Sequence, residues 1–296
     1  MKKVLLCLVF LVCLLKAVTI DELVKHTNEN NYDLKSIDKS INIANHQISL
    51  SKKWQNPVLS LGLNDLWLND LSSRDKEAMQ ASFIGLSQVI PTGSKLEIKE
   101  NIAQKDRNIQ VLNLEDKKLE LESKVYEYVY TILLLERKYK LLESYEQNIK
   151  KLETLFTSLY KYQKVTQNEI LNSQISALDI GLQKQNLKNM IDNSYLKLEQ
   201  ITYTKIDKID ENIDIKKINL LTINQEHPKF KTLEEMANKS KNMADLEAEK
   251  KIPDLMLNVA YFQRDSKFND YVNVSVSFPL PIYDTENTAR LQAKMN

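Results

Sequence analysis

The chain contains 296 residues, of which only 4 are Gly and 6 are Pro. Its 41 basic and 40 acidic residues give a formal net charge of +1, so no basic surface for nucleic acid is expected. The 87 residues between Gly93 and Gly181 include neither helix breaker, which is far beyond the length of an ordinary globular helix. The composition therefore favours long helices over a turn-rich globular enzyme.

The N-terminus has the outline of a secretory signal peptide. Two lysines precede twelve apolar residues from Val4 to Leu15, and Ala17 offers a small residue for cleavage. As a helix this run would span about 18 Å against roughly 30 Å for a bilayer core, so an uncleaved anchor is the weaker alternative. Both cysteines, Cys7 and Cys13, lie in the run, so the exported chain would have no disulfide. We expect residues 1–17 to be removed.

Helices are predicted over residues 18–55, followed by a β-hairpin over residues 56–92. In the first strand Leu59, Leu61 and Leu63 alternate with small or polar residues. This period of two indicates a strand with one apolar face.

Residues 93–203 are predicted to form a long antiparallel helical hairpin whose turn lies near residues 161–167. Its first helix, of about 65 residues and on the order of 100 Å, carries the seven-residue apolar repeat of a coiled coil. The repeat comprises Leu121, Tyr128, Leu135, Leu142, Ile149 and Phe156. Glu146 and Glu153 interrupt the positions four residues on. We therefore expect the seam to shift there onto Tyr145, Leu152 and Leu159.

The returning helix, from about residue 168 to 201, carries one apolar stripe, continued less regularly toward its C-terminus. The stripe comprises Leu171, Ile175, Leu178, Leu182, Leu187, Ile191 and Leu198. We expect this stripe to complete the hairpin seam.

After a connector over residues 204–223, the helix and strand pattern of the first part recurs. Residues 226–260 match residues 30–64 without a gap at an offset of 196, which aligns Pro253 with Pro57. The next strand matches at an offset of 190, which aligns Pro281 with Pro91. We therefore predict a helix over residues 224–251, a second β-hairpin over residues 252–283 and the start of another long helix over residues 284–296.

The alternating strands allow two interpretations: a sheet that covers a soluble core, or the wall of an outer-membrane barrel. The signal peptide favours the barrel, in which apolar residues face lipid and polar residues face the interior. The predicted lipid-facing residues are Leu59, Leu61, Leu63, Leu255, Leu257, Val259, Val272, Val274 and Val276. Trp67 and Tyr261 suit either a membrane interface or a core. Since a closed barrel needs about eight strands or more, four strands would have to be shared among copies of the chain.

Three passages give the chain a resemblance to the TolC-like outer-membrane efflux family. The first is the pair of helix-to-strand junctions at residues 56–59 and 252–255, and the second runs from Gly85 to Lys95. The third is YKYQKVTQNEILNSQ, residues 160–174, which is similar to the helix-turn-helix tip of the family, with Gln163 where a Gly is usual.

The resemblance implies a mainly α protein with a small β part: a long coiled-coil helical hairpin plus two β-hairpins, whose four strands join a shared trimeric outer-membrane barrel. It further implies a periplasmic tunnel of helices and a passive conduit for efflux or type I secretion, with a periplasmic adaptor and an inner-membrane pump as partners. The candidate adaptor-contact residues at the tip are Tyr160, Gln163, Val165, Thr166, Gln167 and Leu171.

The family pattern also includes a second long helical hairpin after the fourth strand. The present sequence ends at Asn296, about a dozen residues after Tyr283, so we expect a fragment or a truncated product that lacks the segment with the main periplasmic gate.

No catalytic residue, metal site or cofactor is predicted. The three histidines, His26, His46 and His227, lack metal-ligand spacing, and no Gly-rich phosphate loop or nucleophile motif occurs. The alternative to a channel is an exported periplasmic coiled-coil protein of structural or adaptor type. The sequence does not identify the cargo.

Overall fold

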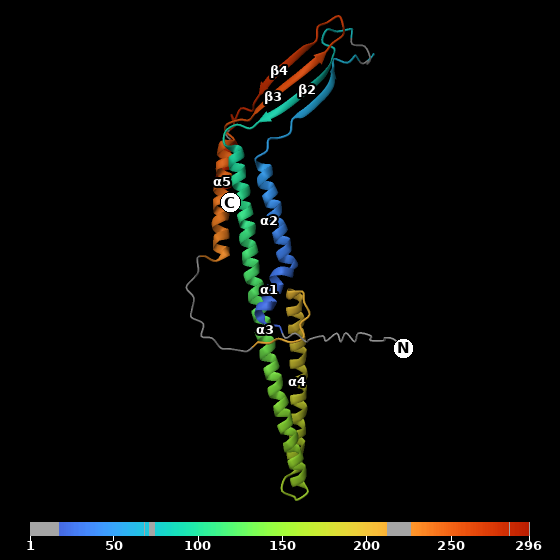
Figure 1. Ribbon diagram of the computed structural model, residues 1–296, viewed down its shortest axis with the longest axis vertical. Helices are drawn as coiled ribbons and strands as arrows, with labels where there is room; N and C mark the ends of the chain where they lie inside the picture. Colours follow the sequence, from blue (N-terminus) through green and yellow to red (C-terminus); the bar gives the residue numbers. More distant parts are fainter. Residues whose placement is uncertain (1–17, 68, 71–74, 212–225, 284, 296) are drawn as a thin grey trace, which may run out of the picture. The chain divides into compact units, whose positions relative to one another are not determined.

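The computed structural model describes residues 18–67, 69–70, 75–211, 226–283 and 285–295. The expected signal peptide and most of the connector lie outside these residues. The described elements are α1 (Ile20–Asn30), α2 (Tyr32–Ser51), β1 (Val58–Asn64), β2 (Ala81–Ile90), α3 (Lys95–Tyr160), α4 (Gln167–Thr202), α5 (Pro228–Glu249), β3 (Leu255–Gln263), β4 (Tyr271–Ser277) and α6 (Thr285–Met295). A mainly helical chain with a four-stranded antiparallel sheet confirms the predicted fold class (Figure 1).

The chain divides into two compact units. The first contains the chain up to Ser36 together with residues 115–224, and the second contains residues 37–114 and 225–296. In the first unit, α4 runs back along the C-terminal part of α3 to form the predicted hairpin (Figure 1). Its core lies beside α1 and comprises Ile20, Leu23, Val125, Val129, Ile132, Leu198, Ile206 and Ile209.

The seam on α3 continues straight through Glu146 and Glu153, so the expected shift near Leu142 is wrong; of the three residues expected in the shifted seam, Leu159 is half-buried. Glu146 and Glu153 are half-buried against α4, while Tyr145 and Leu152 are 53% and 42% exposed. The carboxylate of Glu146 forms a 2.6 Å ion pair with Lys184, and the carboxylate of Glu153 accepts a 2.8 Å hydrogen bond from Gln174. Because Lys184 and Gln174 of α4 lie opposite these carboxylates and donate to them, Glu146 and Glu153 can remain in the seam.

The expected single stripe on α4 is also wrong. Its later members Leu187, Ile191 and Leu198 are half-buried or buried, whereas the earlier members are exposed. The side of α4 that is buried near the turn instead mixes apolar residues with small or polar ones. It comprises Ile170, Ser173, Ala177, Ile180 and Lys184, at the spacing of a heptad seam. The exposed apolar set, here called the outer stripe, comprises Leu171 (46% exposed), Ile175 (63%), Leu178 (71%) and Leu182 (68%).

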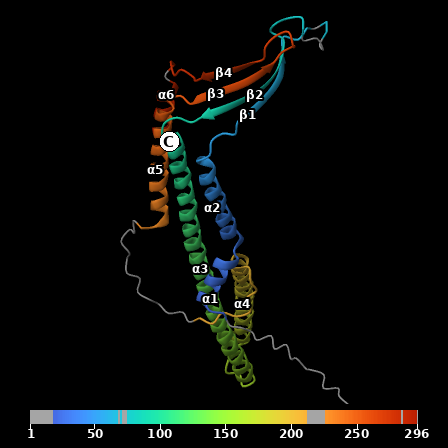
Figure 2. The same ribbon diagram turned by 45° about the horizontal axis from the view of Figure 1, so that its top comes forward.

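The second unit contains the sheet, whose strands lie in the order β1-β2-β3-β4 (Figure 2). Every neighbouring pair is antiparallel; Leu59 pairs with Leu86, Leu86 with Val259 and Val259 with Val274. Among the described residues, the outer edges of β1 and β4 have no neighbouring strand in the sheet.

Helix α5 lies beside the first part of α3, where ion pairs join the two helices. Lys105 of α3 pairs with Glu235 at 3.2 Å, and Lys239 of α5 pairs with Asp106 at 2.6 Å. Helix α5 starts with Pro228 at its first position, and the His227 side chain accepts a hydrogen bond from the N–H of Lys229.

The internal duplication is visible in where the elements begin. The helices α2 and α5 begin 196 residues apart, at Tyr32 and Pro228. The strands β2 and β4 begin 190 residues apart, and so do the helices α3 and α6. Both sequence offsets therefore coincide with structural boundaries.

Candidate functional site: a two-faced sheet, its junction with the helices and the hairpin tip

One face of the sheet is apolar in its central rows, from β1 across to β4. Because directly paired residues of neighbouring strands point to the same side, the register places all nine predicted lipid-facing residues on this face. Ile84 and Leu86 of β2 join them. Leu255 and Leu257 are half-buried and the other seven are exposed, with Leu61 at 70%. The face is broad and, within the described chain, uncovered.

The opposite face carries small and polar residues in its central rows. One row runs from Ser60 through Gly85 and Ala260 to Asn273. In the next row the hydroxyl of Ser87 donates a 2.6 Å hydrogen bond to Asn258 Oδ1. The sheet thus separates an apolar surface from a polar one.

Toward the loops this second face becomes aromatic. The rings of Phe83, Phe262 and Tyr271 follow one another with centroid distances of 5.4 and 4.7 Å. The Phe83 ring lies over Gly62, where a Cβ would be only 2.4 Å from it, so the close approach requires glycine. Arg264 lies 5.2 Å from the Tyr271 ring centroid and donates hydrogen bonds to the carbonyl of Asn269.

The two aromatics singled out in the sequence both lie near the loop end of the sheet. Tyr261 is on the apolar face, 44% exposed, and its hydroxyl donates to the carboxylate of Asp270. Trp67 is 43% exposed beyond the end of β1. Exposure of both side chains fits a membrane interface better than a core.

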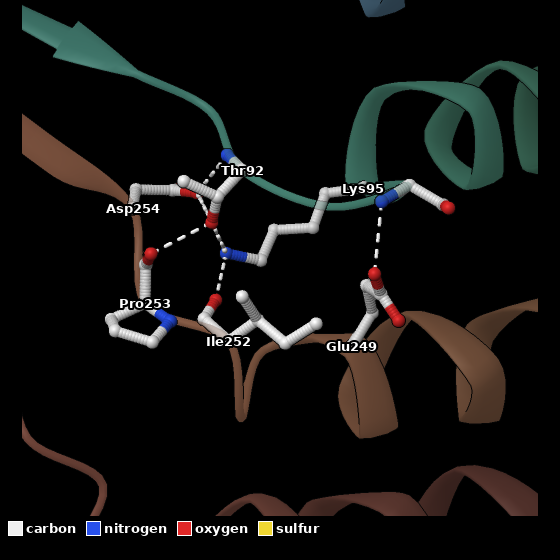
Figure 3. Close-up of polar contacts among 7 residues, drawn as sticks. Thr92, Lys95, Glu249, Ile252, Pro253 and Asp254 are labelled. Atoms are coloured by element: carbon white, nitrogen blue, oxygen red, sulfur yellow. Dashed lines mark hydrogen bonds and ion pairs between the residues drawn. The ribbon is translucent and has the colours of Figure 1, made fainter.

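At the other end of the sheet, a polar cluster joins the β2–α3 turn to the α5–β3 turn (Figure 3). The ammonium of Lys95, whose side chain is 6% exposed, lies 2.6 Å from Asp254 Oδ1 and also donates to the carbonyl of Ile252. Thr92 donates through its N–H to Asp254 Oδ1 at 3.0 Å and through its hydroxyl to the Pro253 carbonyl at 2.7 Å. We call these five residues the junction cluster.

The electrostatics of the junction cluster favour the ionised pair. Burial alone would raise the pKa of Asp254, but hydrogen bonds from Lys95 and from the Thr92 N–H hold that pKa below its usual value. Beside the cluster, Gly93 has a φ of 64°, and a side chain there would also collide with Glu249, which accepts a 2.9 Å hydrogen bond from the Ser94 N–H. The turn is therefore specified by a glycine, a buried cation and two carboxylates.

The predicted tip lies between α3 and α4. Of its six candidate residues, Val165 is half-buried, and Tyr160, Gln163, Thr166, Gln167 and Leu171 are exposed. Gln163 has a φ of 53°, the left-handed conformation that favours glycine. The N–H of Thr166 donates to Glu169 Oε2 at 2.7 Å, and the hydrogen bonds from Thr166 lower the pKa of Glu169. A capping box thus starts α4 and fixes the tip.

A family model covers most of α1 and the elements from α2 to α4. The model described as outer membrane efflux protein matches residues 23–202, more than half of the chain. The chain belongs to the outer membrane efflux protein family. A comparison with curated protein sequences gives no match.

Solved structures of outer-membrane channels share the fold of this efflux-family chain. The Campylobacter jejuni CmeC outer membrane channel has a TM-score of 0.74 at 16% identity, over 93% of this chain and 64% of that chain. The outer membrane protein VceC from Vibrio cholerae has a TM-score of 0.72 at 11% identity, over 93% and 72%. The Neisseria gonorrhoeae MtrE outer membrane channel has a TM-score of 0.69 at 12% identity, over 93% and 66%. The chain therefore spans about two thirds of the length of these channels.

The sequence correctly placed the nine strand residues on one face of the sheet and located the turn between α3 and α4, whereas it did not predict the junction cluster. The segments that form the cluster, residues 85–95 and 252–255, resemble the family in sequence, but their pattern predicts no contact between them. One available signal was a pair of opposite charges at the two turns: Lys95 is the first residue of α3, five residues after β2 ends, and Asp254 directly precedes β3. In the described part of the chain, no group of three His, Cys, Asp or Glu is arranged to bind a metal ion. None of the described helices is long and apolar enough to cross a bilayer.

Proposed function

We propose that the chain is a subunit of an outer-membrane exit duct in an efflux or type I secretion system. The observation that carries this proposal is the sheet with one exposed apolar face, one polar face and two unpaired edges. Lipid can cover the apolar face, but an open strand edge in hydrocarbon leaves backbone groups unsatisfied. Copies of the chain, three in the family pattern, would close the sheet into a barrel of twelve strands.

The helical hairpin supports assembly independently of the sheet. The outer stripe of α4 is apolar and exposed, and Leu141 and Leu155 of α3 are 56% and 50% exposed. Contiguous apolar patches of this kind are typical of surfaces that bind other proteins. Helices of neighbouring subunits would cover them in a periplasmic tunnel.

Substrate would pass through the interior without a chemical step, and the duct would use no cofactor. A periplasmic adaptor would bind the tip through Tyr160, Gln163, Val165, Thr166, Gln167 and Leu171, and an inner-membrane pump would drive transport. The exposure of five of these six residues supports contact with a partner. Export would depend on the signal peptide over residues 1–17.

The test uses two neighbouring residues of β4 that point to opposite faces. Val274→Arg places a cation on the proposed lipid face at mid-strand and should cost about 2–4 kcal/mol, so membrane insertion should fail. Asn273→Arg places the same cation on the polar face and should leave insertion intact. Membrane fractionation and the amount of detergent-extracted oligomer are measured for both.

The two proposed roles for the sheet give different results. Equal tolerance of both arginines would contradict the lipid facing. Recovery of the unmodified chain as a soluble periplasmic monomer would instead favour the alternative, a periplasmic coiled-coil protein of structural or adaptor type.

A further inference from the structure

We propose that β4 of one copy pairs with β1 of the next copy, antiparallel, in the register that places Ser275 opposite Asn64. In this register Val276 lies opposite Leu63, and Ser277 lies opposite Gly62. The inference rests on the proposed function, because it takes assembly of identical copies as given. It adds the residue pairs that form the contact.

The internal duplication supplies the register. Within one chain, β2 ends the strands of the first repeat, β3 begins those of the second, and the structure pairs Gly85 with Ala260. The same step recurs between copies, where β4 ends the second repeat and β1 begins the first repeat of the next chain. Shifting Gly85 by the offset of 190 gives Ser275, and shifting Ala260 back by the offset of 196 gives Asn64.

The faces of the sheet agree with this register. It places apolar Val276 beside apolar Leu63, and it places polar Ser275 beside polar Asn64. A shift by one residue would bring Leu63 beside Ser275 or Ser277 and turn one apolar face toward the interior. Only registers that differ by an even number of residues remain as competitors.

The positions that correspond to the junction cluster at the contact between copies carry uncharged residues. The two offsets carry the buried ion pair Lys95–Asp254 to Thr285 and Val58, so the cation and the anion are replaced together and neither is left unpaired. They also carry Thr92 to Ile282. Val58 and Ile282 are 60% and 70% exposed in the single chain. Their approach in the assembly would bury both side chains.

Closure of a barrel limits the remaining registers. The row of paired residues that begins at Val58 passes through Ser87, Asn258 and Ser275. The proposed pairing continues this row to Asn64 of the next copy, six residues further along β1.

This stagger sets the tilt of the strands. Three copies with twelve strands about 4.8 Å apart and a rise of about 3.3 Å per residue then give a tilt of about 46°. Staggers of eight and two residues would give about 54° and about 19°, outside the roughly 35–45° of known barrels. A stagger of four gives about 35°, so closure alone permits four or six, and the duplication selects six.

The two hairpins of one chain differ in register by two residues. Copying the β1–β2 register to the second repeat would pair Leu255 with Val276, whereas the structure pairs Leu257 with Val276. This change of two residues preserves the faces. At the contact between copies, a register change of two residues would pair Asn64 with Asn273 in place of Ser275.

Disulfide trapping in the full chain separates these registers. Asn64→Cys is combined in turn with Ser275→Cys, Asn273→Cys and Ser277→Cys, which lie on the same face of β4. Directly opposite residues have Cα atoms about 4.5–5.5 Å apart, within disulfide range, and diagonal neighbours about 7–8 Å apart, outside it. After oxidation in membranes, we expect at least about ten times more linked chains with Ser275→Cys than with either other partner. Unmodified and single-cysteine chains control for Cys7 and Cys13.

Each other outcome overturns the inference in a recognisable way. Strongest linkage through Asn273→Cys or Ser277→Cys would replace the register and leave the duct intact. Linkage by Ser275→Cys alone would indicate that β4 pairs with itself. An oligomer in detergent without linkage in any variant would refute the strand pairing, whereas a monomer for the unmodified chain would refute the proposed function as well.

Discussion

The junction cluster predicts an asymmetric response to removal of its two charges. Lys95 is 6% exposed at its side chain and Asp254 is 39% exposed, so water can solvate the anion but not the cation. Lys95→Met therefore leaves a partly hydrated carboxylate that still accepts the Thr92 N–H, and we expect a cost of about 1 kcal/mol. Asp254→Asn leaves a buried ammonium with only neutral acceptors, and we expect about 2–3 kcal/mol.

Hydrogen exchange at the turn measures these costs locally. The N–H of Thr92 and the N–H of Ser94 are hydrogen-bonded to Asp254 and Glu249. A loss of about 2 kcal/mol should accelerate their exchange about thirtyfold in Asp254→Asn, against about fivefold in Lys95→Met. The double variant should exchange more slowly than Asp254→Asn, because the unpaired cation is gone.

A surface ion pair of the same unit provides the control. Lys239 and Asp106 are 31% and 46% exposed, so Asp106→Asn should change the opening free energy by less than about 1 kcal/mol. The reasoning from burial would be refuted if Lys95→Met proved more damaging than Asp254→Asn, or if both matched the control.

Two further predictions concern the helical hairpin. Gln163 has a φ of 53°, so Gln163→Gly should raise the free energy of unfolding in urea by about 1 kcal/mol relative to Gln163→Ala, and equal stabilities would contradict a backbone cost at the tip. Hydrogen bonds from Lys150 and Lys184 lower the pKa of Glu146 to about 2 from 4.5. Because its folded pKa is depressed, this carboxylate contributes stability above pH 4.5 that is lost as the pH falls toward 2. The thermal midpoints of the unmodified chain and Glu146→Gln should therefore converge over this interval, and a constant difference would exclude the ion pairs as the cause.

The strands could be predicted from the sequence because their alternation has only two phases. Once Leu59, Leu61 and Leu63 are assigned to one face, the period of two and the repeat offsets assign the other strands, and the observed register agrees. The proline-linked junctions likewise marked where helix passes to strand. Local pattern was sufficient wherever one face contrasts clearly with the other.

The packing of the helices could not be predicted in this way, because an apolar pattern on one helix does not show which face its neighbour covers. Glu146 was excluded from the seam as a charged residue, although Lys184 lies opposite it. The strongest apolar stripe of α4 was expected to face α3, but Ser173 and Ala177 face inward and Leu178 outward. Where a helix carries two usable faces, the choice depends on residues far away in the sequence.

The inner and outer sides of α4 should respond differently to dissolved salt. Its inner seam depends partly on the Glu146–Lys184 pair and its outer stripe is aliphatic. Concentrated sulfate would strengthen the aliphatic contacts of the outer stripe, whereas it would weaken the Glu146–Lys184 pair only slightly, because a partly buried pair is screened less than a surface pair. Removal of the sulfate would weaken these aliphatic contacts, so in the proposed duct neighbouring subunits would separate while each hairpin stays closed.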